Sequence, residues 1–229
     1  MKQAEERPRV SVIICTLNEE ESLPHVLPEI PDWVDEIVLV DGHSDDGTVE
    51  VARKICPEIK VLYQPGRGKG DALKYGIRSA GGDIIITLDA DGETSPGEMG
   101  RFIEPLLNGY DFAKGTRFFN GLANHRPRHR LLGNRIITST FNVLFSKKYT
   151  DLCSGYNAFW KKAIFKIDPW PADGFENEPF IHCRAAKRGL KVIEVPHIDE
   201  IRIGGEVKES SWRQGFKAIK TIFSERFRG

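Results

Sequence analysis

Short apolar runs alternate with amphipathic stretches through the first half of the chain, and polar or glycine-containing turns follow the runs. Runs of this length and composition are typical of buried strands, and the stretches between them repeat apolar positions at helical spacing. The strand-like runs are 9–16, 36–41, 59–63 and 84–88. After the first run, Asn18 is expected to cap a helix whose first turn carries acids. The alternation predicts an α/β fold, with a mostly parallel central sheet and helices on both faces.

The second half continues with helical patterns, the last of which is amphipathic. Residues 131–145 read as one or two apolar helices, and a helix over 176–188 precedes a strand over 191–195. Near the C-terminus four apolar residues recur at i, i+4, i+7 and i+11: Trp212, Phe216, Ile219 and Phe223. This apolar stripe predicts a helix over 208–228. Such a helix, with basic residues on its other faces, either lies in a membrane interface or packs its stripe on the domain or on a partner subunit.

The composition predicts one compact domain that comprises residues 1–229. At 229 residues and 40% hydrophobic content, the chain is long enough to bury a core without metal or disulfide staples. The 33 basic and 33 acidic residues balance, which argues against a generic nucleic-acid-binding protein. The four cysteines form no C-x-x-C pair, and the start of the chain lacks the apolar segment of a signal peptide. No uncharged apolar run reaches about 18 residues, so we expect a cytoplasmic protein without a membrane-spanning segment.

Two carboxylates stand directly after the fourth strand, in the sequence Asp89-Ala90-Asp91. Open α/β sheets bind ligands at the carboxyl ends of their strands, and Asp41 lies at such an end as well. Two acids one residue apart can share a hard divalent cation that keeps open positions for phosphate oxygens, with Glu93 as a third ligand. Taken alone, the pair would equally serve as a turn or a helix cap.

A glycine-rich loop, Gly66-Arg67-Gly68-Lys69-Gly70, separates the third strand from a helix that ends near Ala80. The backbone N–H groups and the lysine of such a loop bind anions well. The spacing excludes two familiar phosphate motifs. Asp71 stands where the dinucleotide fingerprint needs glycine, and Gly70 stands where the P-loop needs Ser or Thr.

These motifs together resemble those of the family-two inverting glycosyltransferases of the GT-A fold. The matching segments are Val12-Ile13-Ile14-Cys15-Thr16-Leu17-Asn18-Glu19, Val40-Asp41-Gly42-His43-Ser44-Asp45-Asp46-Gly47-Thr48, Gly68-Lys69-Gly70-Asp71-Ala72-Leu73 and Asp89-Ala90-Asp91. The second half is similar to the dolichyl- and polyprenyl-phosphate mannose or glucose synthase group, through Gly115-Thr116-Arg117-Phe118, Asp151-Leu152-Cys153-Ser154-Gly155-Tyr156 and Glu194-Val195-Pro196, with Arg202 downstream. The chain departs from that group at Gly42-His43, at Cys153-Ser154-Gly155-Tyr156 and in lacking a C-terminal transmembrane hairpin. These departures bear on the identity of the acceptor.

The resemblance implies a GT-A, Rossmann-like architecture with two functional halves. Residues 1–110 would bind the sugar nucleotide, and residues 111–229 would bind the acceptor. Within the first half, Asp41 would contact the nucleobase or the ribose, and Asn18 and Glu19 would shape the base pocket. The full donor site implied by the resemblance is Thr16, Asn18, Glu19, Asp41, Lys69 and Asp89.

The resemblance also implies a divalent metal ion. Asp89 and Asp91 would hold the sugar nucleotide through Mg²⁺ or Mn²⁺, and Glu93 would complete the protein ligands. Chemistry supports this expectation, because a diphosphate leaving group gains negative charge as the glycosidic bond breaks, and a cation placed there stabilises that charge most in the transition state.

The segment from Phe112 through Tyr149 is strongly basic and contains no Asp or Glu. Arginine side chains match phosphate oxygens bidentately, so the candidates for the acceptor phosphate or the leaving diphosphate are Arg117, Arg130, Arg135 and Arg202. The family resemblance supports Arg117 and Arg202. The alternative is a solvated basic surface. Nucleic acid is not an expected partner, because the strand-end carboxylates would repel a phosphate backbone.

The predicted function is a metal-dependent, inverting transfer of a hexose from a nucleotide-diphosphate sugar, of the GDP-mannose or UDP-glucose type, to a polyprenyl or dolichyl phosphate. The predicted catalytic residues are Asp91, Arg117, Glu178 and Arg202. A phosphate acceptor is already an anion and needs no general base. A hydroxyl acceptor would need one, and Glu176 or Glu178 is the expected base, unless both acids only favour the N-terminus of their helix.

Two alternatives remain open from the sequence: a glycosyltransferase with a soluble or saccharide hydroxyl acceptor, and a non-catalytic sugar-nucleotide-binding module. A nucleotidyltransferase ranks behind them, because Thr16-Leu17-Asn18-Glu19 stands where its glycine-rich loop with arginine is expected. His197 is expected to be a surface loop histidine rather than a metal ligand. The expected partners are the sugar nucleotide and the acceptor, and the C-terminal helix would hold the protein peripherally on the cytoplasmic face of the membrane.

Overall fold

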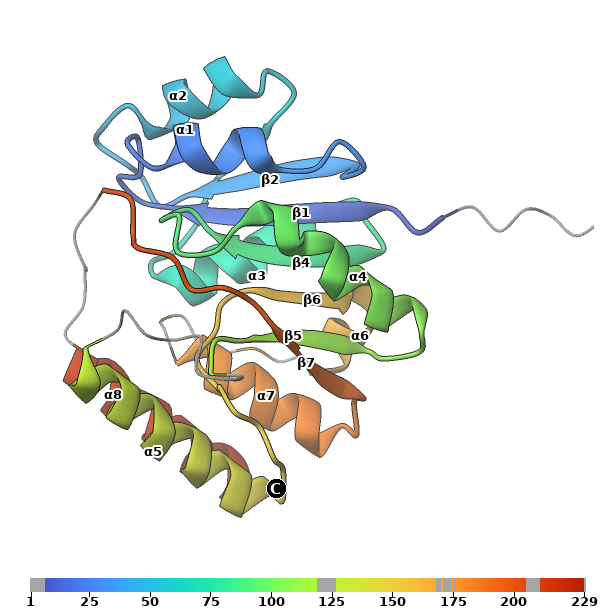
Figure 1. Cartoon of the computed structure of the whole chain (residues 1–229), viewed down its shortest axis with the longest axis vertical. Coiled ribbons are helices and arrows are strands. Elements are labelled where there is room, and N and C mark those ends of the chain that lie inside the picture. Colours follow the sequence, from blue (N-terminus) through green and yellow to red (C-terminus); the bar gives the residue numbers. More distant parts are fainter. Residues whose placement is uncertain are drawn as a thin grey trace, which may run out of the picture.

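The structure is a computed structural model, and it describes residues 7–118, 127–167, 170, 174, 176–204 and 211–228. Within these residues one sheet contains seven strands: β1 (Val10–Thr16), β2 (Glu36–Asp41), β3 (Lys60–Tyr63), β4 (Ile84–Asp89), β5 (Phe112–Thr116), β6 (Asn157–Trp160) and β7 (Val192–Pro196). Their order in the sheet is β3-β2-β1-β4-β6-β5-β7 (Figure 1). β6 pairs antiparallel with β4 and β5, and the other pairs are parallel. The predicted mostly parallel sheet is confirmed.

The helices of the described residues are α1 (Leu23–Val26), α2 (Thr48–Ile55), α3 (Lys69–Ser79), α4 (Met99–Leu107), α5 (Arg128–Phe145), α6 (Lys161–Ile164), α7 (Asn177–Lys187) and α8 (Ser211–Phe227). Short 3₁₀ turns cover Leu27–Glu29, Pro96–Glu98 and Phe165–Ile167. The apolar segment predicted over 131–145 is therefore one helix, α5. The C-terminal helix predicted over 208–228 is α8, and residues 208–210 lie outside the described part of the chain.

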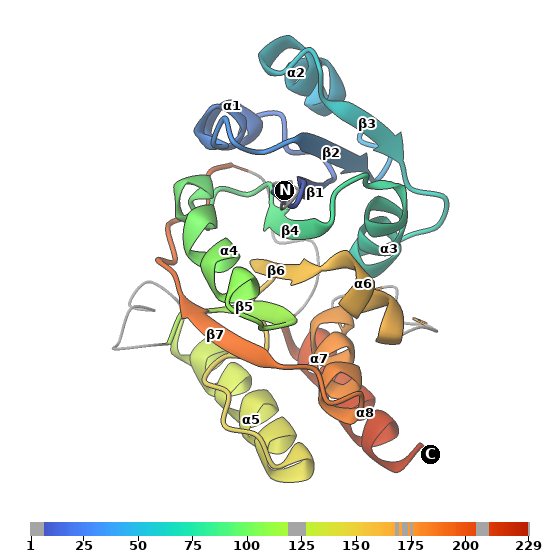
Figure 2. The same cartoon turned by 90° about the vertical axis from the view of Figure 1, so that its right-hand side faces the viewer.

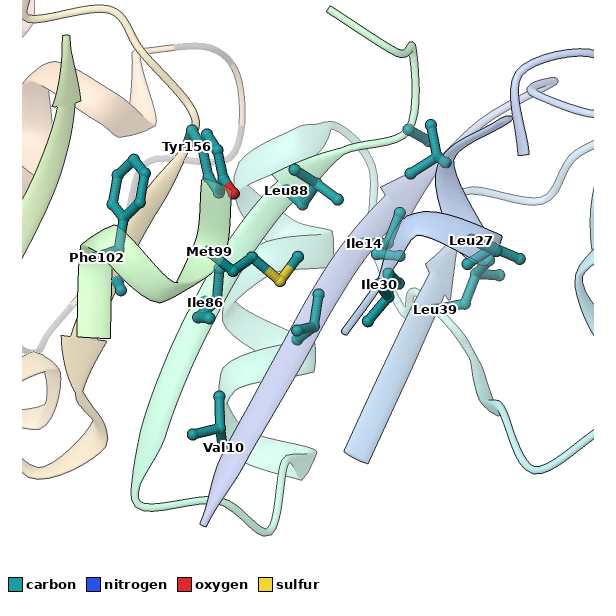
Figure 3. Packing of buried hydrophobic residues seen from close by; sticks show 14 of the residues in the cluster. Val10, Ile14, Leu27, Ile30, Leu39, Ile86, Leu88, Met99, Phe102 and Tyr156 are labelled. Atoms are coloured by element: carbon teal, nitrogen blue, oxygen red, sulfur yellow. The ribbon is translucent and has the colours of Figure 1, made fainter. Parts of the chain in front are cut away.

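Helices cover both faces of the sheet, as predicted (Figure 2). Side chains of α1, α2 and α4 pack in one apolar cluster with alternate residues of β1, and side chains of α3, α6 and α7 pack in a second cluster on the opposite face. In the first cluster, Met99 and Phe102 of α4 lie against Ile86 and Tyr156 (Figure 3). Each fully buried side chain of this size contributes about 1.5–3 kcal/mol to folding.

α5 and α8 form a separate layer below the sheet in Figure 1. Ile137 and Phe141 of α5 pack with Ala218 and Ile222 of α8 in a third apolar cluster. At the other end of the pair, the Arg226 guanidinium donates to the Leu144 carbonyl at 2.9 Å. None of the helices in the described ranges is long and apolar enough to cross a membrane.

The strand register brings the strand-end acids together. In the parallel ladders, Thr16 pairs with Asp41 on one side of β1, and Cys15 pairs with Asp89 on the other. The carboxyl ends of β1, β2 and β4 therefore meet at one edge of the sheet, where ligands bind in open α/β folds.

Candidate active site

The end of β4 presents two carboxylates that each face a basic side chain. Lys69, at the start of α3, forms an ion pair with Asp89. Arg202 donates from Nη1 to Asp91 at 3.0 Å and from Nη2 to Glu19 at 2.9 Å. Four segments that are distant in sequence, those of Glu19, Lys69, Asp89–Asp91 and Arg202, thus meet at the carboxyl end of the sheet.

The turn after β4 holds the segment that carries Arg202. Gly92 has φ +74°, a left-handed conformation that glycine adopts without strain. A Cβ at Gly92 would lie 2.9 Å from the Cδ1 atom of Ile203, so the close approach also requires glycine. The Ile203 N–H donates to the Asp91 carbonyl at 2.9 Å. The backbone therefore places Arg202 beside the Asp91 carboxylate.

The carboxylates after β4 suit a hard divalent cation. Burial, together with the nearby charges of Asp89 and Glu93, raises the pKa of Asp91 to about 7, although the Glu93 N–H and Arg202 oppose the rise. Crowded carboxylate oxygens of this kind are the ligands that Mg²⁺ and Mn²⁺ prefer. In the described residues, no three His, Cys, Asp or Glu side chains are already gathered around a common point. In this structure the carboxylates of Asp89 and Asp91 pair with Lys69 and Arg202.

The loops after β1 and β2 are joined by polar contacts. Asp41 is buried and accepts hydrogen bonds from Thr16 Oγ1 at 3.2 Å and from the N–H and Oγ of Ser44 at 2.9 and 2.5 Å. The prediction that Asn18 caps a helix is wrong. Asn18 adopts a left-handed φ of 52°, its side chain exchanges two hydrogen bonds with Asp45, and the following helix starts only after Ser22.

Glu178 lies in the interior behind the Lys69–Asp89 pair. It is 6% exposed, and Asn157 Nδ2 donates to its carboxylate at 3.2 Å. Burial raises the pKa of Glu178 to about 7, Lys69 opposes the rise and Asp89 adds to it. Burial also disfavours the charged form of Lys69, but Asp89 and Glu178 outweigh that effect and hold its pKa above the ordinary value. A Cβ at Gly155 would lie 2.8 Å from both charged groups of the Lys69–Asp89 pair, so a larger residue there would displace the pair.

Arg117 forms a buried bidentate pair with Asp151. Its Nε and Nη2 donate to the two carboxylate oxygens at 2.7 and 3.0 Å, and Asn134 Nδ2 donates to the same carboxylate at 2.9 Å. Burial alone would raise the pKa of Asp151, but the charges of Arg117 and Lys114 outweigh it and hold that pKa far below its usual range. The arginine that the sequence assigned to the acceptor is therefore already oriented by an acid.

The remaining predicted site residues lie at several places around the Asp89–Asp91 turn and the Arg117–Asp151 pair. Glu93 follows the Asp89–Asp91 turn, and its N–H donates to Asp91 at 3.1 Å. Arg130 is partly buried and Arg135 is exposed, and both lie on the first half of α5. The expectation of a surface His197 is wrong: His197 is 1% exposed, and its ring nitrogens lie 3.0 Å from Ser154 Oγ and from the Ile198 carbonyl.

Sequence reasoning missed three residues that hold these groups in place. Asp151, Asn157 and Lys114 each contact or face a predicted site residue from the interior. Asp151 could have been found from the sequence, because it begins one of the segments that carry the family resemblance. Lys114 counts only as one of the basic residues between Phe112 and Tyr149, and Asn157 gives no signal.

Residues 11–167 match the sequence model of glycosyl transferase family 2. The chain belongs to glycosyl transferase family 2. The match includes the strand ends, the glycine-rich loop, the Asp89–Asp91 turn and Arg117, and it ends before Glu178 and Arg202. The prediction of a glycosyltransferase is thereby confirmed.

Two relatives in the family are similar over most of their length. A dolichyl-phosphate hexose transferase from Haloferax volcanii is 31% identical over 217 residues, which cover 93% of this chain and 92% of that protein. A polyprenol monophosphomannose synthase from Mycolicibacterium smegmatis is 29% identical over 207 residues, which cover 82% of this chain and 76% of that protein.

Solved structures share the fold. Glucosyl-3-phosphoglycerate synthase from Mycobacterium tuberculosis, in complex with Mn²⁺, UDP and phosphoglyceric acid, superposes with a TM-score of 0.73. The superposition covers 97% of this chain and 80% of that chain at 20% identity. This likeness confirms the predicted GT-A fold.

Proposed function

We propose that the protein transfers a hexose from a nucleotide-diphosphate sugar to a polyprenyl phosphate, with inversion at the anomeric carbon. An oxygen of the acceptor phosphate attacks that carbon, the new glycosyl–phosphate bond forms, and the nucleoside diphosphate leaves with the electrons of the broken bond. Relatives named dolichyl-phosphate hexose transferase and polyprenol monophosphomannose synthase support a lipid phosphate as acceptor.

The donor would bind along the carboxyl ends of β1, β2 and β4. Asp41 and the loop from Thr16 to Glu19 line the part where the nucleoside would lie, and Lys69 and Arg202 supply positive charge for the diphosphate. Asp89, Asp91 and Glu93 would hold Mg²⁺ or Mn²⁺, and the cation would neutralise charge on the leaving diphosphate. A solved structure of the same fold that contains Mn²⁺ and UDP supports this arrangement.

The acceptor phosphate would be bound by arginines, and no residue need remove a proton from it. Arg117 is held by Asp151 with its guanidinium in a fixed orientation, which suits bidentate binding of a phosphate. Glu178 is buried behind the Lys69–Asp89 pair and bonded to Asn157. That position supports an electrostatic role for Glu178 better than contact with an acceptor hydroxyl.

The observation that supports a lipid acceptor is a set of exposed apolar side chains on α5 and α8. Its members on α8 include Trp212 and Phe216, which are 83% and 72% exposed, and on α5 Leu132 and Ile136, which are 60% and 49% exposed. In Figure 1 both helices begin on the side of the molecule where β1 and β4 end. Exposed aromatic side chains on a basic helix are typical of proteins that lie in a membrane interface.

Purified protein incubated with Mn²⁺ or Mg²⁺, a panel of GDP- and UDP-hexoses and a short-chain polyprenyl phosphate tests the proposal. We expect lipid-linked sugar and nucleoside diphosphate in equal amounts, and loss of both in Asp91→Ala. Asp32→Ala is the matched control, because Asp32 is an exposed acid away from the site. Transfer to a hydroxyl acceptor but not to the lipid phosphate would reject the lipid proposal, and donor binding without any transfer would reject catalysis.

A further inference from the structure

Lys114 is a fully buried lysine in the central sheet. Its side chain has no exposed surface, and its Nζ donates to the Gly115 carbonyl at 2.8 Å and lies 6.0 Å from the centre of the Tyr149 ring. A buried ammonium group is strongly disfavoured unless acids nearby compensate its charge. The structure must therefore supply that compensation close to β5.

Two acids near Lys114, Glu178 and Asp151, supply it. Asn157 pairs with Lys114 in the β5–β6 ladder and donates to Glu178, so Glu178 lies next to the lysine on one side. Lys114 lowers the pKa of both Glu178 and Asp151, which shows that its charge acts on each acid. Asp151 in turn holds Arg117.

The neighbouring His182 does not share this role. It lies on α7 one turn after Glu178, and its ring meets those of Phe112 and Tyr149 edge to face. Neither ring nitrogen has a hydrogen-bond partner among the described residues. Burial, together with the charge of Lys114, holds the pKa of His182 well below its ordinary value. A neutral histidine leaves Glu178 and Asp151 as the groups that compensate Lys114.

Six charged groups form a row of alternating sign through the interior, from Asp89 at the strand end to Arg117; its two ends, Asp89–Lys69 and Asp151–Arg117, are ion pairs, and the members between them act on one another electrostatically. In order, its members are Asp89, Lys69, Glu178, Lys114, Asp151 and Arg117. Three acids and three bases alternate, so each internal member has an opposite charge on both sides. Lys114 is the member that joins the donor end to the acceptor end.

We propose that Lys114 is a positioning residue, which fixes Glu178 and Arg117 relative to each other through this row and so aligns the donor with the acceptor. The inference rests on the proposed transfer to a phosphate acceptor. Lys114 itself touches neither substrate. Without its charge, Glu178 would keep only the charge of Lys69 and Asp151 only that of Arg117, and the balance of charge between the two ends of the row would be lost.

The test compares Lys114→Met with Lys161→Met at a temperature well below the melting point of each variant. Lys161 is a suitable control because it also donates to a backbone carbonyl, that of Ala80, but lies outside the row. We expect Lys114→Met to lower kcat at least about tenfold, because small misplacements of reacting groups have effects of that size or larger. Lys161→Met should keep the wild-type kcat and KM values. Lys114→Arg, which retains the charge, should recover part of the lost kcat.

Affinity for GDP and UDP with Mn²⁺, measured by calorimetry without acceptor, is a readout that does not need turnover. Lys114→Met should weaken it on the order of tenfold, since Lys114 acts on the charge of Glu178, and Glu178 in turn acts on the Lys69 ammonium that pairs with Asp89. The proposal would be overturned if Lys114→Met lowered only the melting temperature and left kcat and the nucleotide affinity at their wild-type values. If Lys114→Met does not fold, Lys114→Gln, which also removes the charge, takes its place, and wild-type kcat and nucleotide affinity in Lys114→Gln would overturn the proposal. Wild-type protein that binds nucleotide but transfers no sugar would reject the proposed function, and the nucleotide affinities would still decide this inference.

Discussion

Arg117→Gln should strongly destabilise the protein, because it removes one partner of a buried ion pair. Asp151 is fully buried, and Arg117 donates two hydrogen bonds to it at 2.7 and 3.0 Å. Removing one partner of such a pair costs about 3–5 kcal/mol, since the other charge stays buried without compensation. For a chain of this length, we expect the melting temperature to fall by about 6–20 °C. Circular dichroism melts of wild type and variant at pH 7 measure the difference.

The matched control is the same substitution at an exposed pair. Arg101 is 52% exposed and pairs with Glu98 at 2.5 Å. Exposed pairs contribute about 0–1 kcal/mol, so Arg101→Gln should lower the melting temperature by no more than about 4 °C. The folded-state pKa of Asp151 is depressed, so the stability from the Arg117 pair is present above about pH 4 and is lost as the pH falls further. Equal melting temperatures for Arg117→Gln and Arg101→Gln at pH 7 would refute the reasoning.

Three further predictions concern other parts of the molecule. Burial raises the folded-state pKa of Glu178 to about 7. Wild type should therefore lose up to about 3 kcal/mol of stability as the pH rises from about 4 to 7, and Glu178→Gln should show a flatter curve in urea melts across that range. Gly155→Ala places a Cβ 2.8 Å from the charged groups of the adjacent ion pair and should weaken nucleotide diphosphate binding on the order of tenfold. Gly133→Ala, whose Cβ meets nothing within 4 Å, should leave that binding unchanged. Trp212→Ser with Phe216→Ser should reduce co-sedimentation with phosphatidylglycerol vesicles at least about tenfold, because each buried aromatic contributes about 1.5–3 kcal/mol, while the melting temperature stays at the wild-type value.

Local patterns are sufficient to predict the first four strands and the acids at their ends. Apolar runs identify the buried strands directly, and parallel strands all end at the same edge. The sequence alone therefore predicts that Asp41 and Asp89 lie at one edge, and the register beside Thr16 and Cys15 confirms that placement. α8 is predictable from local sequence as well, because the apolar residues of its stripe recur at helical spacing.

Features that depend on distant partners are not predictable from local patterns. Asn18 fits a helix cap by its position before a run of acids, but hydrogen bonds to Asp45, 27 residues away, hold it in a left-handed turn instead. His197 fits a surface loop, but Ser154, 43 residues away, and the packing around it place it in the interior. Lys114 fits an exposed strand position until Glu178 and Asp151 are brought beside it.

The arginines show how a prediction from local sequence differs from a feature that depends on distant partners. Charge and family resemblance assign Arg117 and Arg202 to phosphate binding. In the structure Arg117 is bonded to Asp151, and Arg202 to Asp91 and to Glu19, which is 183 residues away. An incoming phosphate must therefore compete with these acids or bind the guanidinium edges that they leave open. A guanidinium already held by an acid loses less side-chain entropy when a substrate binds, so the acids that lower its free charge also prepare it to bind phosphate. In the proposed transfer, the acids of these pairs therefore contribute to phosphate binding as much as the arginines do, although local patterns identify only some of them.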